Sequence, residues 1–438
     1  MRKSGVLNAV VILKQTMIKY ISKILLYILV SQQFSLLAQV GLNPNPSFEQ
    51  SQSNSPSSIL KTFNNGGFVL TEKSAIPVKS TNSLKEVTRI LEDIKTEEEL
   101  PTELKNTDEH NFNTIGFELA FNEITKMLET NSVSLKRAVF LSESAYYNAS
   151  ADLNAYLEFE QEIKKMGDII RSSYVASQIK KKTPLDINKL VMKFLTDTMS
   201  YIPVGSEGKV KVSKPIKYDF NDPFGDDDLS KLFVSKLITT KSGQCKSIPL
   251  LFLLLVEELG GEAFLSFSPE HSFIKVKNGK GGFYNFELTN GKIMSDALMV
   301  ASGYIKSEAI RNGIFLDTIN QKQVVAQCLV DLANIYRRRF GESEFVLKCA
   351  NKSLEYFPNN IHGLMLKSNY HTRLFNYMLK SCNAENEEEL KKCPKTYKQF
   401  QLMHKMYALI DGVGYEPIPE DVYMSWLNEM EKQATAQN

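Results

Sequence analysis

Pro249 stands near the start of an apolar block, 248–256, which is followed by the Gly260–Gly261 pair. The length and composition of the block predict a buried helix over about 246–259, stopped by the two glycines. Proline is accepted only in the first turn of a helix, because it lacks an amide hydrogen and its ring collides with the carbonyl four residues earlier. The helix therefore begins no earlier than about Cys245, which places that sulfur at its N-terminal end.

A cysteine at the start of a helix has the surroundings that nucleophilic catalysis needs. The partial positive charge of the helix end favours a thiolate over a thiol. Backbone N–H groups of the first turn have no acceptor inside the helix, so they could hold a developing oxyanion. Cys245 is therefore the candidate nucleophile, and Gln244 before it is a candidate supporting residue.

A turn signal, Asn278–Gly281, joins two strand patterns that follow this helix. A turn centred between residues 279 and 280 would place His271, which opens the first strand, opposite residue 287 or 288. Glu287 is then a direct or near-direct neighbour of His271, and Asn285 shares the face of Glu287 because side chains repeat every two residues. A thiolate, an imidazole and a carboxylate are the parts of nucleophilic acyl transfer.

The same residues resemble a known family. The stretch 243–245 (Gly-Gln-Cys) ahead of a buried helix, His271 at the start of a strand, and 286–289 (Phe-Glu-Leu-Thr) resemble the transglutaminase-like superfamily, in the branch that is paired with tetratricopeptide-like repeats. The resemblance covers roughly residues 130–300. It implies an α+β fold with a papain-like core and a Cys–His–Asp triad.

The resemblance assigns a role to each member of the triad. Cys245 would attack a carbonyl carbon, His271 would take and return the proton, and Glu287 would hold the imidazole, with Asn285 as a substitute. Three positions depart from the family pattern: Lys246 replaces a frequent aromatic residue, the acid is glutamate instead of aspartate, and residue 288 is leucine instead of proline. The lysine argues against protein crosslinking as the reaction.

The N-terminus has the pattern of a secretory signal peptide. Lys14, Lys19 and Lys23 precede the apolar run 24–30, and Ala38 is a small residue suited to cleavage. The run is too short for a hydrocarbon layer that needs about 20 apolar residues. We therefore expect export to the periplasm or the exterior, with an uncleaved membrane anchor as the alternative and membrane contact only through that segment.

The chain is predicted to be α+β, with a helical N-terminal portion, a transglutaminase-like core and tetratricopeptide-like helices at the C-terminus. Its expected parts are a signal peptide over 1–38, a low-complexity tether and weakly structured segment over 39–110, a transglutaminase-like domain with N-terminal helices over 111–300, and a helical region over 301–438. Three strand patterns, 263–266, 271–277 and 282–288, predict a small antiparallel sheet within the core.

The helical region has the spacing of one tetratricopeptide-like helix pair, at about 322–357. Such a pair could form a groove for a protein or peptide partner, or it could simply pack on the core. Cys382 and Cys393 flank a polar loop and could form a disulfide, whereas Cys328 and Cys349 lie in apolar patterns typical of buried thiols.

These observations predict an exported protein that performs thiol-dependent acyl transfer or hydrolysis on a peptide or protein substrate. The competing hypothesis is an idle transglutaminase-like scaffold that binds partners through its C-terminal helices. The chain has 52 Lys and Arg against 50 Asp and Glu, so its overall charge does not indicate binding to nucleic acid. No metal-ligand spacing was found in the sequence, and no cofactor is expected.

Overall fold

The computed structural model describes residues 84–97, 114–176, 183–203, 208–301 and 304–435. The predicted signal peptide, 1–38, and the low-complexity tether lie outside these residues. Within the described residues, none of the helices combines the length and the apolar character that a membrane span requires. The protein is α+β, as the sequence predicted.

The helices before the sheet are α3 (Leu84–Glu97), α5 (Ile115–Glu129), α6 (Leu135–Ser144), η3 (Ala145–Tyr147), α7 (Leu153–Ala176), α8 (Pro184–Thr196), η4 (Leu229–Leu232), α9 (Val234–Thr240) and α10 (Ser247–Glu258). The helices after it are α11 (Asp296–Ala301), α12 (Ser307–Arg311), α13 (Gln321–Phe340), α14 (Glu344–Tyr356), α15 (Ile361–Cys382), α16 (Glu387–Leu390), α17 (Pro394–Gly412) and α18 (Glu420–Thr435). The strands are β1 (Met199–Tyr201), β2 (Lys211–Ser213), β3 (Lys217–Tyr218), β4 (Ser242–Gly243), β5 (Phe264–Ser268), β6 (His271–Lys277), β7 (Phe283–Glu287) and β8 (Lys292–Met294).

Helix α10 lies in the core because almost its whole surface is apolar. Every residue from Ser247 to Val256 is buried, and the helix packs against α7, α8, α9 and the sheet strands β5 and β6. The ring of Phe252 meets Phe286 of β7 edge to face, with centroids 6.1 Å apart. This burial fixes the direction of α10 and therefore the position of the chain that enters it at Cys245.

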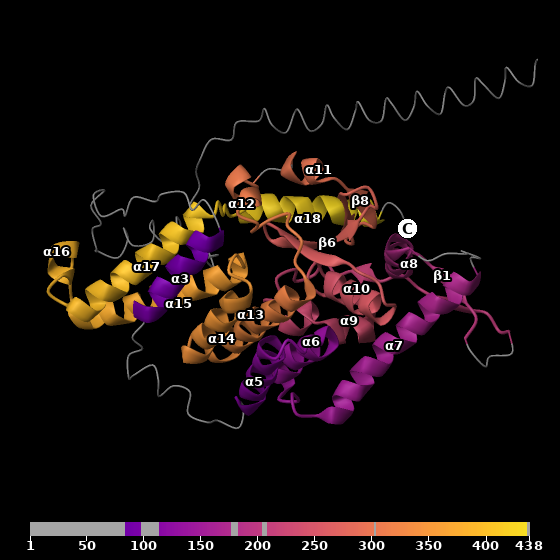
Figure 1. The fold of residues 1–438 in the computed structure, drawn as a ribbon, viewed down its shortest axis with the longest axis horizontal. Helices are drawn as coiled ribbons and strands as arrows, with labels where there is room; N and C mark the ends of the chain where they lie inside the picture. Colours follow the sequence, from indigo (N-terminus) through magenta and orange to yellow (C-terminus); the bar gives the residue numbers. More distant parts are fainter. Residues whose placement is uncertain (1–83, 98–113, 177–182, 204–207, 302–303, 436–438) are drawn as a thin grey trace, which may run out of the picture. The chain divides into compact units, whose positions relative to one another are not determined.

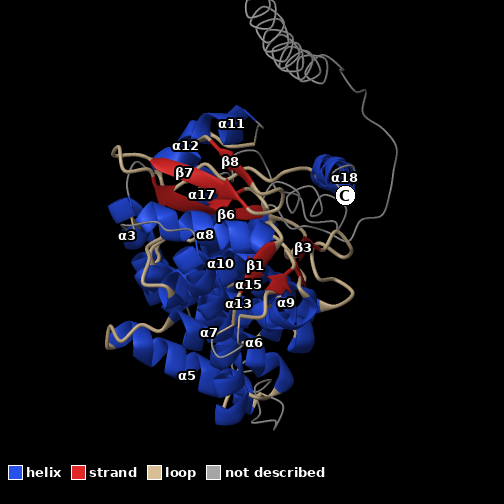
Figure 2. Ribbon diagram, turned by 90° about the vertical axis from the view of Figure 1, so that its right-hand side faces the viewer, coloured by secondary structure: helices blue, strands red, loops and turns tan. Residues whose placement is uncertain are grey.

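The strands β5, β6, β7 and β8 form an antiparallel sheet in that order. Figure 2 shows helices on both sides of it, with α8 and α10 on one side and α11 and α12 on the other. Ile274, Val276 and Phe286 are buried with the helical core, while Lys275 and Asn285 hydrogen-bond Asp296 at the start of α11. One face of the sheet is thus held by packing and the other by hydrogen bonds.

The hairpin between β6 and β7 is longer by one residue than the sequence prediction. Asn278 N–H donates to the Gly282 carbonyl at 2.9 Å, and the Asn278 side chain accepts from the amides of Lys280 and Gly282. Gly279 and Gly281 have φ of 74° and 83°, a region that glycine adopts without strain. The turn is therefore centred on Lys280, and the predicted position of His271 opposite residue 287 or 288 is wrong.

The C-terminal helices occupy the residues where the sequence predicted helices. Helices α13 and α14 form a hairpin, and α15 begins at Ile361 after the Asn360 cap. Helix α13 packs against α5, α6, α14 and α15, so it is largely buried. Cys382 and Cys393 form a disulfide, and burial raises the pKa of the Cys328 and Cys349 thiols well above the ordinary value.

Helix α3 lies within the segment 39–110, which was expected to be weakly structured. Val87, Leu91 and Ile94 are buried, and the helix packs on α17, as Figure 1 shows in indigo beside yellow. Val87, Ile90, Leu91 and Ile94 have helical spacing, but the stripe is short and lies in an otherwise polar segment, so no helix was predicted there. Packing on another helix, rather than propensity, stabilises it.

Candidate active site

Cys245 lies between the short strand β4 and the start of α10. Strands β3 and β4 pair in parallel, with Tyr218 opposite Gly243, and the chain then passes through Cys245 into α10. Ile248 N–H donates to the Gln244 carbonyl at 3.0 Å, so the first turn of the helix forms directly after the cysteine. Cys245 is partly exposed and has no disulfide partner. Its sulfur is therefore at the N-terminal end of α10, as Pro249 predicted.

Gln244 fastens the loop beneath the cysteine. Its side chain is fully buried, and Nε2 donates to the Asp222 carbonyl at 2.8 Å and to the carbonyls of Asp219 and Asn221 at 3.4 Å. Its backbone N–H donates to the Ser247 hydroxyl at 3.0 Å. The role that this geometry gives Gln244 is the support of the loop rather than contact with a reacting group.

His271 and Glu287 form a close pair at one end of the two central strands, where β6 begins and β7 ends. Nε2 of the ring lies 2.7 Å from Oε2 of Glu287, whose other oxygen accepts the Thr289 N–H at 2.9 Å. Continuing the β6–β7 register places Phe273 opposite Glu287, so His271 reaches the acid as a diagonal neighbour. A carboxylate only accepts hydrogen bonds, so Nε2 carries the proton.

The pKa values of the pair are set by burial and by the charges beside each group. Burial alone would lower the pKa of His271, but the Glu287 charge, the adjacent Cys245 side chain and the hydrogen bond to Glu287 raise it well above the ordinary value. Burial alone would raise the pKa of Glu287, yet the His271 charge and the hydrogen bonds from His271 and Thr289 hold it below the ordinary value. Both shifts favour the charged form, an imidazolium on His271 and a carboxylate on Glu287.

The ring of His271 also lies beside the candidate nucleophile. It is close enough to the Cys245 side chain for the sulfur to influence the pKa of the ring. Because Glu287 occupies Nε2, Nδ1 is the nitrogen left for the sulfur. The Ser272 hydroxyl donates to the Cys245 carbonyl, which ties the start of β6 to the residue before α10. The structure thus brings together Cys245, His271 and Glu287.

Two tyrosines meet the same sulfur, and the sequence did not identify either. The hydroxyls of Tyr218 of β3 and Tyr423 of α18 lie close enough to the Cys245 side chain for its charge to act on both of them. Burial, followed by the Cys245 charge, raises the pKa of both phenols well above the ordinary value. Tyr218 is in a two-residue strand and Tyr423 is in the last helix, so no local pattern linked them to Cys245.

Asn285 does not join the pair. Its Nδ2 donates to Asp296 at 2.7 Å, and its Oδ1 accepts from Lys275 at 3.0 Å, so its amide is used on the α11 side of the sheet. The expectation that Asn285 could substitute for Glu287 therefore has no support in the hydrogen bonds. Lys246, the departure beside the nucleophile, forms an ion pair with Asp331 of α13 at 2.9 Å.

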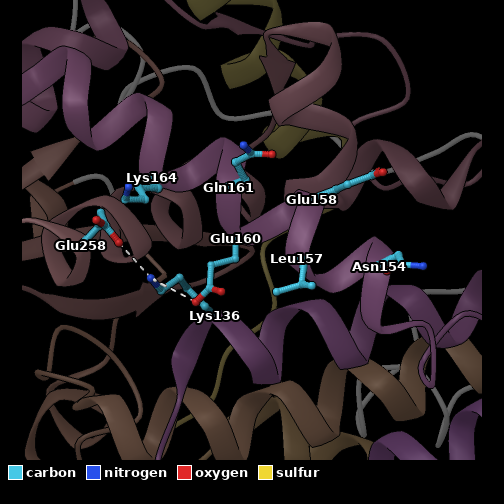
Figure 3. A pocket seen from close by; sticks show the side chains of 8 residues that line it. All are labelled: Lys136, Asn154, Leu157, Glu158, Glu160, Gln161, Lys164 and Glu258. Carbon is cyan, nitrogen blue, oxygen red and sulfur yellow. Dashed lines mark hydrogen bonds and ion pairs between the residues drawn. The ribbon is translucent and has the colours of Figure 1, made fainter. Parts of the chain in front are cut away.

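A surface hollow of about 760 Å³ lies away from these residues, between α6, α7 and the end of α10 (Figure 3). Lys136 on its wall contacts Glu258 at 2.9 Å and Glu160 at 3.8 Å. Its lining contains no histidine or cysteine, so it cannot supply the thiol and imidazole that the sequence predicted. Among the described residues, no group of three or more His, Cys, Asp or Glu side chains could hold a metal ion.

Comparisons with known proteins add little to this geometry. No family model matches the chain, and no curated protein matches it. Among solved structures, a crystal structure of menin that reveals the binding site for the Mixed Lineage Leukemia (MLL) protein is similar over 69% of this chain and 69% of that chain. The two sequences are 12% identical and the TM-score is 0.27, a value that does not establish a shared fold.

Proposed function

We propose that this chain is a thiol-dependent acyl transferase or hydrolase with a transglutaminase-like, papain-like core. The observation that carries the proposal is the series Cys245–His271–Glu287, in which the imidazole is hydrogen-bonded to the acid and lies beside the thiol. It is assembled from the start of α10, the start of β6 and the end of β7, which lie far apart in sequence. A nucleophile, a base within hydrogen-bond reach and a group that orients the base are the signature of covalent catalysis.

The reaction follows from the roles of these atoms. The Cys245 thiolate forms a bond to the carbonyl carbon of a carboxamide or peptide, and the carbonyl electron pair moves to the oxygen. The imidazolium of His271 gives its Nδ1 proton to the departing amine as the C–N bond breaks, which leaves a thioester. Glu287 keeps the Nε2 proton in place throughout and balances the imidazolium charge.

The second half of the reaction decides the class of enzyme. Water or an amine attacks the thioester, His271 accepts its proton, and Cys245 leaves as a thiolate again. Water makes the chain a peptidase or amidase, and an amine makes it a transglutaminase. The Lys246–Asp331 ion pair, where related enzymes often have an aromatic residue, favours hydrolysis over crosslinking.

The setting of this activity is also a proposal. The signal-peptide pattern over 1–38 supports export to the periplasm or the exterior, and a peptide or protein in that compartment is the proposed substrate. Helix α13 is largely buried against its neighbours, so we assign the C-terminal helices mainly to packing on the core.

The proposal is tested by covalent labelling of the full chain. The protein is treated with iodoacetamide at mildly acidic pH, and the modified peptide is identified by mass spectrometry. We expect Cys245 to react faster than a model thiol and the His271→Gln variant to lose most of that advantage. His362→Gln serves as the matched control, because burial lowers the pKa of His362 to about 4 and this ring is not hydrogen-bonded to Cys245.

Acyl transfer itself is followed with p-nitrophenyl acetate, which forms an acetyl thioester on a nucleophilic cysteine. A burst of p-nitrophenol that disappears in Cys245→Ser supports the proposal. A wild-type rate no greater than that of Cys245→Ser, together with ordinary alkylation, would refute it and favour the scaffold hypothesis.

A further inference from the structure

Helix α18 brings a side chain from the C-terminal end of the chain to the candidate nucleophile. Tyr423 is 6% exposed, and its hydroxyl lies close enough to the Cys245 side chain to feel its charge. Figure 1 draws α18 in yellow, and Figure 2 shows it nearly end-on, near β3. The partner ring from β3 is Tyr218, which packs against the same apolar cluster as Tyr423.

The attachment of α18 is small and separate from the main core. Its buried members are Ile418, Tyr423 and Leu427, and they form a cluster of their own. The ring of Tyr423 lies 5.1 Å from Phe224, between centroids, and that of Trp426 lies farther along the helix, 6.2 Å from Tyr304. A segment held by so few apolar contacts belongs to the low-stability part of a structure, which opens most easily.

The residues just before α18, Gly414 and Tyr415, are packed tightly against the preceding part of the chain. Gly414 has φ of 90°, and a Cβ there would stand 2.5 Å from the Ala309 backbone nitrogen, so the backbones are in close contact. Tyr415 packs on Phe315, with ring centroids 6.3 Å apart. Movement of α18 would therefore be confined to the segment from about residue 416 onward, and the sheet and α10 would stay in place.

The phenols occupy the positions that a substrate needs. An attacked carbonyl must bring its carbon to the sulfur and its oxygen to a nearby N–H donor. In this structure the hydroxyls of Tyr423 and Tyr218 lie beside the Cys245 side chain, in the space that a substrate carbonyl would have to enter. Tyr218 belongs to the β3–β4 ladder, whereas Tyr423 is carried by the weakly attached helix.

We propose that α18 is a lid that closes the acyl-transfer site through the contact of Tyr423 with Cys245, and that substrate is admitted when this helix moves away. The proposal rests on the proposed function for the identity of the site, but the closing contact is a property of the structure alone. Opening breaks the Tyr423 contact and exposes the anchor Leu427, while the Cys245–His271–Glu287 series remains intact.

The test compares the access of two thiol reagents to Cys245 in the full chain. Iodoacetamide is small, and a polyethylene-glycol maleimide is bulky. Leu427→Ala removes a buried anchor of α18, and Met424→Ala on the exposed face of the same helix is the matched control. Loss of a buried leucine contact should shift the opening equilibrium enough to raise the bulky-reagent rate about ten-fold or more. Met424→Ala should leave it unchanged.

A second variant decides between a lid and a catalytic donor. Tyr423→Phe keeps the ring and removes only the hydroxyl beside Cys245. Tyr415→Phe is the control, because it removes the hydroxyl of a half-buried tyrosine on which Cys245 has no effect. A lid predicts faster maleimide labelling and faster acylation by p-nitrophenyl acetate for Tyr423→Phe. Slower acylation, or a bulky-reagent rate unchanged in both Leu427→Ala and Tyr423→Phe, overturns the lid. If Leu427→Ala fails to fold by circular dichroism, Tyr423→Phe alone decides.

Failure of the lid is distinguishable from failure of the proposed function. The His271→Gln change is combined with Leu427→Ala. Faster labelling in Leu427→Ala that does not depend on His271 supports the lid and refutes the activated nucleophile. Labelling that depends on His271 but is no faster in Leu427→Ala supports the nucleophile and refutes the lid.

Discussion

The substitution Glu287→Gln tests the electrostatic core of the site with almost no change in shape. In the wild type, one carboxylate oxygen accepts from Nε2 of His271 at 2.7 Å and the other accepts from the Thr289 N–H at 2.9 Å. A glutamine can satisfy only one of these two donors with its single oxygen. Its amide nitrogen must then face the other donor.

The two orientations of the glutamine have different consequences. If its oxygen stays on Thr289, the amide donates to Nε2 and the neutral ring must carry its proton on Nδ1, where it cannot accept a proton from the thiol. If the amide flips, Nε2 keeps its proton, but the Thr289 N–H loses its acceptor. An unsatisfied donor costs about 1–3 kcal/mol, which limits the penalty of the first orientation to roughly 10–100-fold in rate.

A second loss is the charge of the carboxylate. A hydrogen bond to a charged group stabilises by about 1–1.5 kcal/mol more than a neutral one, so the imidazolium that forms during catalysis loses a further factor of about ten. We therefore expect acylation of Cys245 by p-nitrophenyl acetate to slow by about 10²–10³-fold in Glu287→Gln. The pKa of His271 should fall, since the Glu287 charge is the largest of the effects that raise it.

The pH dependence of stability has a defined sign. The folded pKa of His271 is raised, so its contribution is present below pH 6.5 and is lost as the pH rises through the folded value. The folded pKa of Glu287 is lowered, so its contribution is present above pH 4.5 and is lost as the pH falls through the folded value. The difference in unfolding free energy between wild type and Glu287→Gln should therefore be largest at pH values above the folded pKa of Glu287 and below the folded pKa of His271.

The assays are stopped-flow acylation and urea denaturation across that pH range. Glu262→Gln is the matched control, because Glu262 pairs with Lys277 at 2.6 Å but both side chains are more than half exposed. An exposed pair contributes about 0–1 kcal/mol, so this control should keep its acylation rate. Acylation by Glu287→Gln within a factor of two of the wild type would refute the orienting role of the acid.

Three further outcomes are expected. Gly243→Ala should lower the free energy of unfolding by about 1–3 kcal/mol, because the added Cβ would overlap the Leu237 side chain; an unchanged thermal midpoint would contradict this. Reduction of the Cys382–Cys393 disulfide should cost about 3 kcal/mol in urea denaturation, since the bond closes a short loop, and no change on adding reductant would count against it. Burial raises the pKa of Glu143 from 4.5 to about 7, so its contribution is lost as the pH rises, and the wild type should lose about 3 kcal/mol more than Glu143→Gln between pH 4.5 and 7. Parallel pH profiles for the two proteins would refute that assignment.

The position of Cys245 was predictable because local rules fix it. Pro249 limits where α10 can begin, and an apolar surface on all sides requires burial, so Cys245 had to precede a buried helix. The pairing of His271 with Glu287 was predictable only in part, since one hairpin carries both residues but the length of its turn sets their register. These features depend on short stretches of chain and on one turn.

The tyrosines and the fate of Asn285 were not predictable in this way. Tyr423 reaches Cys245 only because the whole C-terminal region folds back on the core, and no pattern near either residue encodes that contact. Asn285 lies on the face of the sheet that the pattern predicted, but its amide oxygen accepts from the buried Lys275 opposite it and its amide nitrogen donates to Asp296 of α11. A strand pattern gives the face of a side chain and leaves its partner undetermined.

The length of one turn decides whether His271 and Glu287 can meet at all. Residues directly opposite each other in an antiparallel pair point to the same face, and faces alternate along each strand. A turn centred between residues 279 and 280 would pair odd with even positions and would send His271 and Glu287 to opposite faces. The observed turn centred on Lys280 pairs odd with odd, as in Lys275 opposite Asn285, and so puts both on one face. The glycines at 279 and 281, with their positive φ, make that longer turn possible and thereby permit the contact between base and acid.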